Sequence, residues 1–316
     1  MGALCILWAT GAILFDLPAD TLIRRIIAVL FLTLTVFFWY FGRSRMRLIG
    51  PALFLLVLGW WFTQKPSSDR KWLPDADRTA WAEISGDIVT LHNVRNCDYW
   101  SETNFTPRWE TRVVQLSRIT GIDMAINYWG SPMMAHPIVS FQFADAKPVC
   151  FSIETRKEQG ESYSAIGGIY RQYELIYIVA DERDVIRLRT NFRQGEDIYL
   201  YRLNITPEKA RGRFLEYVAS LNGLHREPQW YNAVTTNCTT SIRTQHEGKR
   251  QPWDWRILVN GYADEMLYER GAIGDGKLPF KEFKTASLIN PEAKAADESE
   301  DFSARIRAKA PSFTGK

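Results

Sequence analysis

Three apolar runs fill the first 64 residues and constrain the fold more than any other feature of this sequence. They cover residues 1–17, 26–42 and 48–64, each about 17 residues long. A helix of that length is at the lower limit for crossing the roughly 30 Å hydrocarbon core of a bilayer. One such run also fits a buried core helix. Three in succession, separated by charged turns, predict a membrane segment of about three transmembrane helices over residues 1–64.

The charges of the chain follow the same division. The whole sequence has 39 Lys and Arg against 36 Asp and Glu, a net charge of +3. Residues 1–64 contain five of the basic residues and two of the acidic ones, so residues 65–316 have no net charge. A domain that binds nucleic acid carries a basic surplus on its folded part. The sequence therefore predicts membrane lipid as a partner and no nucleic acid.

The basic turns give conflicting signals about orientation. Residues 42–47 contain three Arg and no acidic residue, which favours a cytoplasmic turn and places residues 65–316 on the opposite side of the membrane. Lys65, Arg70 and Lys71 directly follow the third apolar run and favour the reverse topology. The charge pattern alone leaves both topologies open.

After a polar linker over residues 65–80, the sequence has the pattern of a mixed α and β domain. Residues 88–94 alternate between apolar and polar side chains, as a half-buried strand does. Two β-branched and aromatic runs, 138–143 and 149–153, flank a short turn sequence and predict a β-hairpin. Further strands are predicted at 173–179 and 198–203, and a helix at 207–221.

Residues 81–290 are predicted to form this one α+β domain. Residues 291–316, rich in Ala, Glu and Lys, are predicted to be a C-terminal tail, either a terminal helix or a loosely attached extension. Within the domain, residues 181–189 (DERDVIRLR) are unusually dense in charge. Such a run is typical of a solvated helix start with internal ion pairs. A docking surface for lipid headgroups or substrate is the alternative.

Cys238 is the strongest candidate for a reactive group. Residues 235–237 (TTN) have the polar side chains of a helix N-cap, which places Cys238 in the first turn of a helix. Unpaired backbone N–H groups and the helix dipole stabilise a thiolate at that position. The same N–H groups can stabilise an oxyanion, with the Asn237 side chain as a further donor. The spacing alone fits a buried structural cysteine as well.

A thiol nucleophile needs a base, and His136 is the best placed of the four histidines. Period-two alternation along residues 136–143 puts His136 on the polar-leaning face of its strand. If the hairpin pairs residue 136 with residue 154, Glu154 shares that face and orients the imidazole. A register shift of one residue would remove this contact. The alternatives are a strand-end histidine that only forms hydrogen bonds, and an ion pair of Glu154 with Arg156 or another surface base.

The other candidate polar residues either support the site or have no role in it. His92 follows a strand in a polar run, where it either lines the site or fixes a loop. Tyr231 shares a stretch with Asn237 and is assigned to substrate or oxyanion support. His225 and His246 lie in polar, loop-like sequence and are expected to be solvated. No His, Cys or carboxylate pair has metal-ligand spacing, and a P-loop and a GxGxxG motif are lacking, so no metal and no cofactor is predicted.

Several stretches, in their order along the chain, resemble the Lnb-type periplasmic domain of bacterial membrane proteins. Between about residues 72 and 308 they are HNVRNCDY (92–99), WGSPMMAHPIVSFQF (129–143), FSIETRKEQGESYS (151–164), YELIYIVADERDVIRLRTN (173–191), YNAVTTNCTT (231–240) and DFSARIR (301–307). The resemblance implies an α+β domain of circularly permuted papain-like fold, in which the strand with the histidine precedes the helix with the cysteine. It thereby implies that Cys238 and His136 are the active centre.

The family takes its name from a lipoprotein N-acyltransferase, so the resemblance implies acyl transfer at the bacterial inner membrane, with the domain in the periplasm. Cys238 would attack an ester or amide carbonyl, and His136 would take and return the proton. An amine acceptor, such as that of a lipoprotein, makes the protein an acyltransferase, and water makes it a hydrolase. The alternatives are a peptidoglycan amidase or peptidase and a non-catalytic envelope binding module.

The remaining cysteines of the domain add one prediction. Disulfides form and persist in oxidising compartments such as the periplasm. If the domain lies there, Cys97 and Cys150 are expected to pair and to leave Cys238 free.

Overall fold

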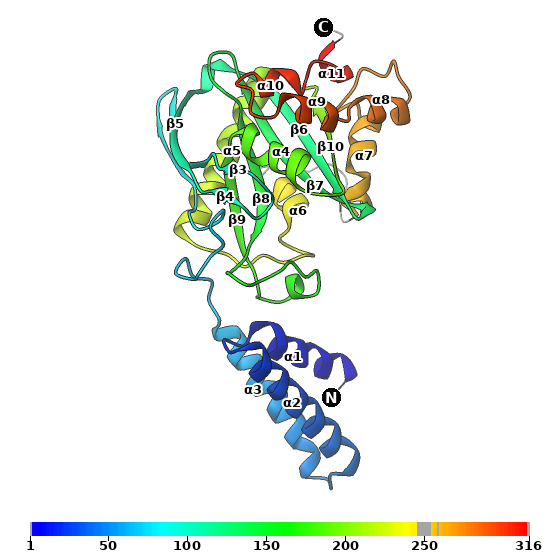
Figure 1. The fold of residues 1–316 in the computed structure, drawn as a ribbon. Helices are drawn as coiled ribbons and strands as arrows, with labels where there is room; N and C mark the ends of the chain where they lie inside the picture. The colour runs from blue at the N-terminus through cyan, green and yellow to red at the C-terminus, as the bar shows by residue number, and fades with distance from the viewer. Residues whose placement is uncertain (1, 245–253, 258, 315–316) are drawn as a thin grey trace. The chain divides into compact units, whose positions relative to one another are not determined.

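Figure 1 shows the computed structural model of the chain, which describes residues 2–244, 254–257 and 259–314. His246, expected to be solvated, lies outside the described residues. The chain forms two compact units that interleave along the sequence. Unit 1 consists of Met1–Lys71, Thr155–Leu175 and Pro228–Thr236, and unit 2 of Trp72–Glu154, Ile176–Glu227 and Asn237–Lys316.

The three predicted apolar runs form helices in unit 1. They are α1 (Ala3–Asp16), α2 (Thr21–Phe41) and α3 (Ile49–Thr63), the last preceded by the single turn η1 (Met46–Leu48). The helix α2 and the stretch Met46–Thr63 are long and apolar enough to cross a membrane, by length and composition. With 14 residues, α1 is only about 21 Å long and falls short of a hydrocarbon core of roughly 30 Å. Two of the three expected spans therefore have the required length.

Unit 2 is built on a mixed β-sheet. Its strand order is β1 (Trp81–Ser85), β2 (Ile88–Arg95), β9 (Glu174–Ala180), β8 (Val149–Arg156), β7 (Ser131–Phe143), β6 (Ile119–Trp129) and β10 (Glu196–Arg202), and β5 (Trp109–Gln115) also pairs with β2. The pairs β6–β7, β7–β8 and β6–β10 are antiparallel, whereas β2 and β9 meet in parallel. β3 (Asp98–Tyr99) and β4 (Phe105–Thr106) form a separate small sheet. The predicted α+β class is confirmed.

Both faces of β7 are covered, which explains its nearly continuous apolar sequence. On one face, the Phe141 ring packs edge-to-face on Phe214 of α5 (Pro207–Arg226), with ring centroids 5.0 Å apart. α5 begins at Pro207, directly after its N-cap Thr206. On the other face, Ile138 joins a core cluster with residues of α4 (Glu182–Arg187), α9 (Asn290–Ala296) and α10 (Phe302–Arg305). Alternating residues of β7 thus separate two hydrophobic layers.

The C-terminal residues belong to the core of unit 2. Phe302 and Ile306 are 0% and 1% exposed and pack in the same cluster as Ile138. Arg307 donates hydrogen bonds to Asp123 on β6 and to Glu182 on α4, at 2.9 and 2.8 Å. Of the two alternatives predicted for this segment, a loosely attached extension is therefore wrong: the described residues 291–314 form short helices, and their apolar side chains cover one face of the sheet. The remaining C-terminal elements are η5 (Trp255–Ile257), η6 (Asn260–Tyr262), α7 (Ala263–Glu269), α8 (Phe280–Ala286) and α11 (Pro311–Thr314).

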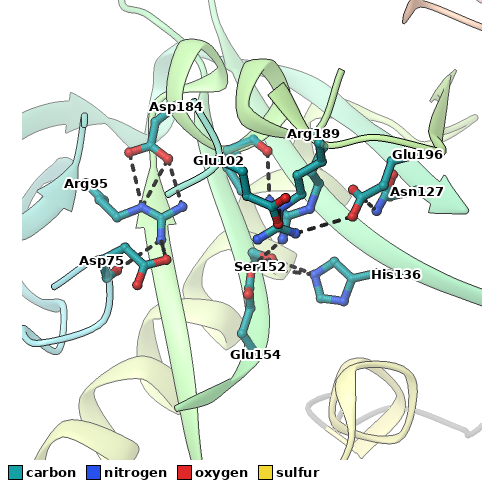
Figure 2. Close-up of polar contacts among 12 residues, drawn as sticks. Asp75, Arg95, Glu102, Asn127, His136, Ser152, Glu154, Asp184, Arg189 and Glu196 are labelled. Atoms are coloured by element: carbon teal, nitrogen blue, oxygen red, sulfur yellow. Dashed lines mark hydrogen bonds and ion pairs between the residues drawn. The ribbon is translucent and has the colours of Figure 1, made fainter. Parts of the chain in front are cut away.

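The charged run 181–189 is buried, so the expectation of a solvated helix start was wrong. Five of its members are less than 5% exposed: Asp181, Glu182, Asp184, Arg187 and Arg189. Asp184, for example, accepts hydrogen bonds from the Arg95 guanidinium on β2, as Figure 2 shows. Each buried charge in the run pairs with a residue distant in sequence, which a local pattern cannot reveal.

Cys97 and Cys150 are free thiols, so the expected disulfide between them is absent. Cys97 packs in a small cluster with Tyr99 and Leu188, whereas Cys150 lies in the main core cluster with Ile138. Burial raises the pKa of Cys97 to about 12, so this thiol stays protonated at neutral pH.

Candidate active site

The β7–β8 hairpin brings His136 and Glu154 to the same face of the sheet. The register pairs Ile138 with Ser152. Because the strands are antiparallel, the same register, extended two residues back along β7 and two residues on along β8, sets His136 opposite Glu154. The condition on which the predicted contact depended is therefore met, and the two side chains lie together on one face.

Ser152 stands between these two side chains, as Figure 2 shows. The His136 Nε2 atom lies 2.7 Å from Ser152 Oγ, and Ser152 Oγ donates to Glu154 Oε1 at 2.7 Å. A hydroxyl carries a single proton, and this one points to Glu154. His136 must then donate from Nε2, which leaves Nδ1 as the unprotonated ring nitrogen. That tautomer has a free basic nitrogen on the side of the ring away from Ser152.

Arg189 completes the chain of contacts. It extends from η4 (Leu188–Phe192), a turn of π-helix directly after α4, and its Nη2 donates to Glu154 Oε1 at 2.7 Å. Burial alone would raise the pKa of Glu154, but the charges of Arg189 and His136 outweigh it and hold this pKa well below the usual range. Burial lowers the pKa of His136 to about 4. At neutral pH the site therefore contains an ionised Glu154 and a neutral His136.

Cys238 is the first residue of α6 (Cys238–Thr244), where the sequence predicted it. Asn237 caps this helix: its Oδ1 accepts from the Thr240 backbone N–H at 2.9 Å, and its own N–H donates to Thr240 Oγ1 at 2.9 Å. The Asn237 oxygen is thus engaged in the cap. The Cys238 side chain is largely buried, at 9% exposure.

Asn260 links the cysteine to the histidine strand. Its Oδ1 accepts from the Ala135 backbone N–H at 2.8 Å, and its Nδ2 lies 3.8 Å from Cys238 Sγ, within donating distance for sulfur. One amide side chain thus contacts both the thiol and the residue next to His136, and α6 itself packs against β7. The next residue must be Gly261, because a Cβ there would lie 2.1 Å from the Pro132 carbonyl oxygen. No motif or periodicity in the sequence singled out Asn260.

An apolar cavity of about 180 Å³ lies beside Asn260. Asn260 forms part of its wall, together with Pro137, the neighbour of His136, and Ile242, one helical turn beyond Cys238. The other lining side chains are mostly aliphatic and come from β6, η5, and α7 with its C-cap: Met124, Ile126, Ile257, Ala263, Met266, Leu267 and Arg270. A cavity of similar size and lining in another protein holds a small hydrocarbon.

Two other predicted residues are placed elsewhere. His92 stacks on Trp81, with ring centroids 3.9 Å apart, and β9 and β8 separate its strand from β7 in the sheet. The structure therefore does not bring His92 to His136. Tyr231 belongs to unit 1, where its backbone N–H donates to the Tyr173 carbonyl at 3.0 Å. Among the residues that the structure describes, no group of three or more His, Cys, Asp or Glu is arranged to hold a metal ion.

The lowered pKa of His136 predicts how the free energy of unfolding depends on pH. An unfolded histidine takes up its proton near pH 6.5, whereas His136 in the fold does so only near pH 4. The unfolded chain binds more protons between these values, so stability is full above pH 6.5 and falls as the pH drops, by roughly 3 kcal/mol in total. Urea unfolding of the full chain at pH 7 and pH 4.5 measures this loss. His136→Asn is expected to show a smaller loss, and equal losses would contradict the prediction.

The region that contains this site matches a known protein family. The family model described as the Lnb N-terminal periplasmic domain matches residues 105–261. The matched range includes His136, Glu154, Cys238 and Asn260. The family resemblance found in the sequence is thus confirmed for residues 105–261. Neither the curated proteins nor the solved structures gave a match.

Proposed function

We propose, on the premise that residues 105–261 are an Lnb N-terminal periplasmic domain, that this chain is a membrane-anchored cysteine acyltransferase or hydrolase of the bacterial envelope. The observation that carries the proposal is the Asn260 side chain, which contacts both the Cys238 thiol and the backbone beside His136. A cysteine and an oriented, neutral imidazole are the two groups that acyl-enzyme chemistry requires. The strand with the histidine precedes the helix with the cysteine, as in a circularly permuted papain-like domain.

In the first half-reaction His136 Nδ1 takes the proton of the Cys238 thiol, and Sγ attacks the carbonyl carbon of an ester or amide. The tetrahedral intermediate collapses to a thioester, and the leaving alcohol or amine receives the proton from His136. In the second half-reaction His136 removes a proton from an incoming amine or water, which attacks the thioester and regenerates the thiol. An amine acceptor, such as the N-terminus of a lipoprotein, gives N-acylation, and water gives hydrolysis.

Ser152, Glu154 and Arg189 hold the imidazole for these transfers. The Glu154 carboxylate is positioned to stabilise the imidazolium that forms at His136, through Ser152 and across the 3.8 Å between Nε2 and Oε1. Arg189 keeps that carboxylate ionised and in place. These side chains share the roles of the third member of a catalytic triad.

A fatty acyl group is the substrate that best fits the surroundings. The cavity beside Asn260 and Pro137 is apolar and can accept several methylene groups of an acyl chain. The helix α3 separates the Arg-rich turn 42–47 from the residues that follow Gln64. If α3 crosses the bilayer, the positive-inside rule places that turn in the cytoplasm and the domain in the periplasm. This topology gives a multi-pass protein of the inner membrane with its thiol on the periplasmic side.

The proposal is tested by trapping the acyl-enzyme. Membranes containing the full chain are supplied with phospholipids that carry an alkyne-tagged acyl chain, and tagged protein is detected after coupling to a dye. We expect a hydroxylamine-sensitive adduct that peptide mass spectrometry locates on Cys238. Cleavage of cell-wall peptides without an acyl adduct would instead indicate an amidase or peptidase. A thiol that forms no adduct with any donor would indicate a binding module.

A further inference from the structure

Two short segments of unit 1 form a plate, which we define by Tyr163, Ile166, Ile169 and Val234. The backbone N–H of Ala233 donates to the Gly168 carbonyl at 2.7 Å, which joins the single turn η3 (Gly167–Ile169) to residues 232–236. The Asn232 side chain adds a bond to the Ile169 carbonyl at 2.9 Å. The plate is therefore a joined surface rather than two independent loops.

The plate exposes large apolar side chains on adjacent segments. Tyr163, Ile166, Ile169 and Val234 are 47%, 61%, 48% and 54% exposed. Single exposed apolar residues are common on soluble surfaces, but several on two joined segments mark a contact site. Something other than water is expected to cover them.

The residues that follow the plate attach it to the ends of the apolar helices. The Tyr170 ring stacks on Phe15 of α1, with centroids 5.3 Å apart. The Arg171 backbone N–H donates to Asp16 Oδ1 at 3.0 Å, and its guanidinium lies 3.6 Å from the centroid of the Trp61 ring on α3. Asp16 ends α1 and Trp61 lies in the last turn of α3. Tryptophan at the end of an apolar helix typically marks the boundary between hydrocarbon and headgroups.

The side chains at this boundary have the polarity of a headgroup region. A cavity of about 690 Å³ in unit 1 is lined by charges of both signs, among them Arg24, Arg70, Glu158 and Glu161. The plate is therefore attached where apolar helix gives way to charge. Because the plate adjoins the ends of the apolar helices and a charged region like that of lipid headgroups, a phospholipid surface is the partner that fits it.

We propose that the plate is a membrane-contact surface that inserts into the interfacial layer of the bilayer that holds α2 and α3. Ile166, Ile169 and Val234 would enter the boundary between headgroups and acyl chains, as the apolar face of an interfacial helix does. Val234 precedes Cys238 by four residues. Contact of the plate with lipid would hold the chain that leads into the nucleophile at the membrane surface.

The test uses the full chain in phospholipid nanodiscs, with Cys5 and Cys238 replaced by Ala so that the remaining native thiols are the buried Cys97 and Cys150. A bimane label is placed at Ile166→Cys or at Ile84→Cys. Ile84 is the matched control, because it is 51% exposed on β1 of unit 2. Lipids with a nitroxide near the carbonyl are expected to quench the label at residue 166 at least about twofold more than at residue 84.

Equal quenching at the two positions, together with strong quenching by aqueous iodide at residue 166, would overturn the proposal. So would a blue shift at residue 166 that depends on protein concentration and not on nitroxide lipid, because it would assign the plate to a second copy of the chain. The labelled protein lacks Cys238, so this result is independent of acyl transfer. Failure of the contact surface and failure of the proposed function are therefore distinguishable.

Discussion

Replacing Cys238 with alanine is expected to reduce acyl transfer or hydrolysis to background, a fall of at least about 10⁴-fold in kcat. The expected loss is large because no other side chain in the mechanism can form the covalent intermediate. The measurement is the rate of release of a tagged acyl group by purified full chain in nanodiscs. The substitution removes one sulfur from a largely buried position, so circular dichroism and the melting temperature must show that the fold is retained.

Cys5→Ala is the matched control for this experiment. Cys5 lies on α1, is outside any disulfide as Cys238 is, and has no role in the proposed mechanism. We expect its variant to keep wild-type kcat. If Cys238→Ala also keeps a kcat within about tenfold of wild type, less than the loss of even one catalytic proton-transfer group would cause, the thiol is not the nucleophile.

Replacing Arg307 with methionine is expected to lower the free energy of unfolding by about 3–5 kcal/mol. Arg307 bonds Asp123 and Glu182, two carboxylates that are both 0% exposed. Asp123 keeps an ion pair with Arg202 in the variant, but Glu182 loses the charge that offsets its burial and lowers its pKa. For a domain of this size the loss corresponds to a fall of roughly 10 °C in the melting temperature.

Arg305→Met provides the comparison for Arg307→Met. Arg305 is the last residue of the short helix α10, two residues before Arg307; it is exposed, and its side chain donates to the Ala295 carbonyl. A change of at most about 1 kcal/mol is expected. Thermal melting of the two variants in the same detergent measures the difference. Similar melting temperatures would show that the C-terminal segment does not hold the sheet and its covering helices together.

The local pattern of the sequence was enough to predict most of the sheet. The runs 138–143 and 149–153 form the predicted hairpin between β7 and β8. The helix predicted at 207–221 is the core of α5, and α6 begins at Cys238. These elements could be predicted because each depends on near neighbours: an alternating face, a turn, or a polar cap before an apolar face.

Features that depend on distant partners could not be predicted in this way. Residues 181–189 have the sequence of a solvated helix start, but Asp184 pairs with Arg95 and Arg189 pairs with Glu154. The tail beyond residue 290 is polar on average, yet its few apolar residues cover the sheet. The local sequence records the charges and not the partners that permit their burial.

The candidate site likewise contains residues that the local pattern predicts and one that depends on a distant contact. His136 and Glu154 could be paired from strand register alone. Ser152, which separates them, belongs to the same hairpin and could have been found by extending the alternation along β8. Asn260 comes from a short turn far along the chain, and only the folded structure shows that its amide contacts the thiol.

The interleaving of the two units limits how this protein can be divided. Tyr170 and Arg171 belong to a long excursion of the chain between β8 and β9, and they contact Phe15, Asp16 and Trp61. Removing residues 1–71 would delete those partners and leave the Tyr170 ring and the Arg171 guanidinium without their contacts. A shortened protein of this kind would expose new apolar area and tend to aggregate in solution. Any preparation for crystallography or kinetics should therefore retain the helices.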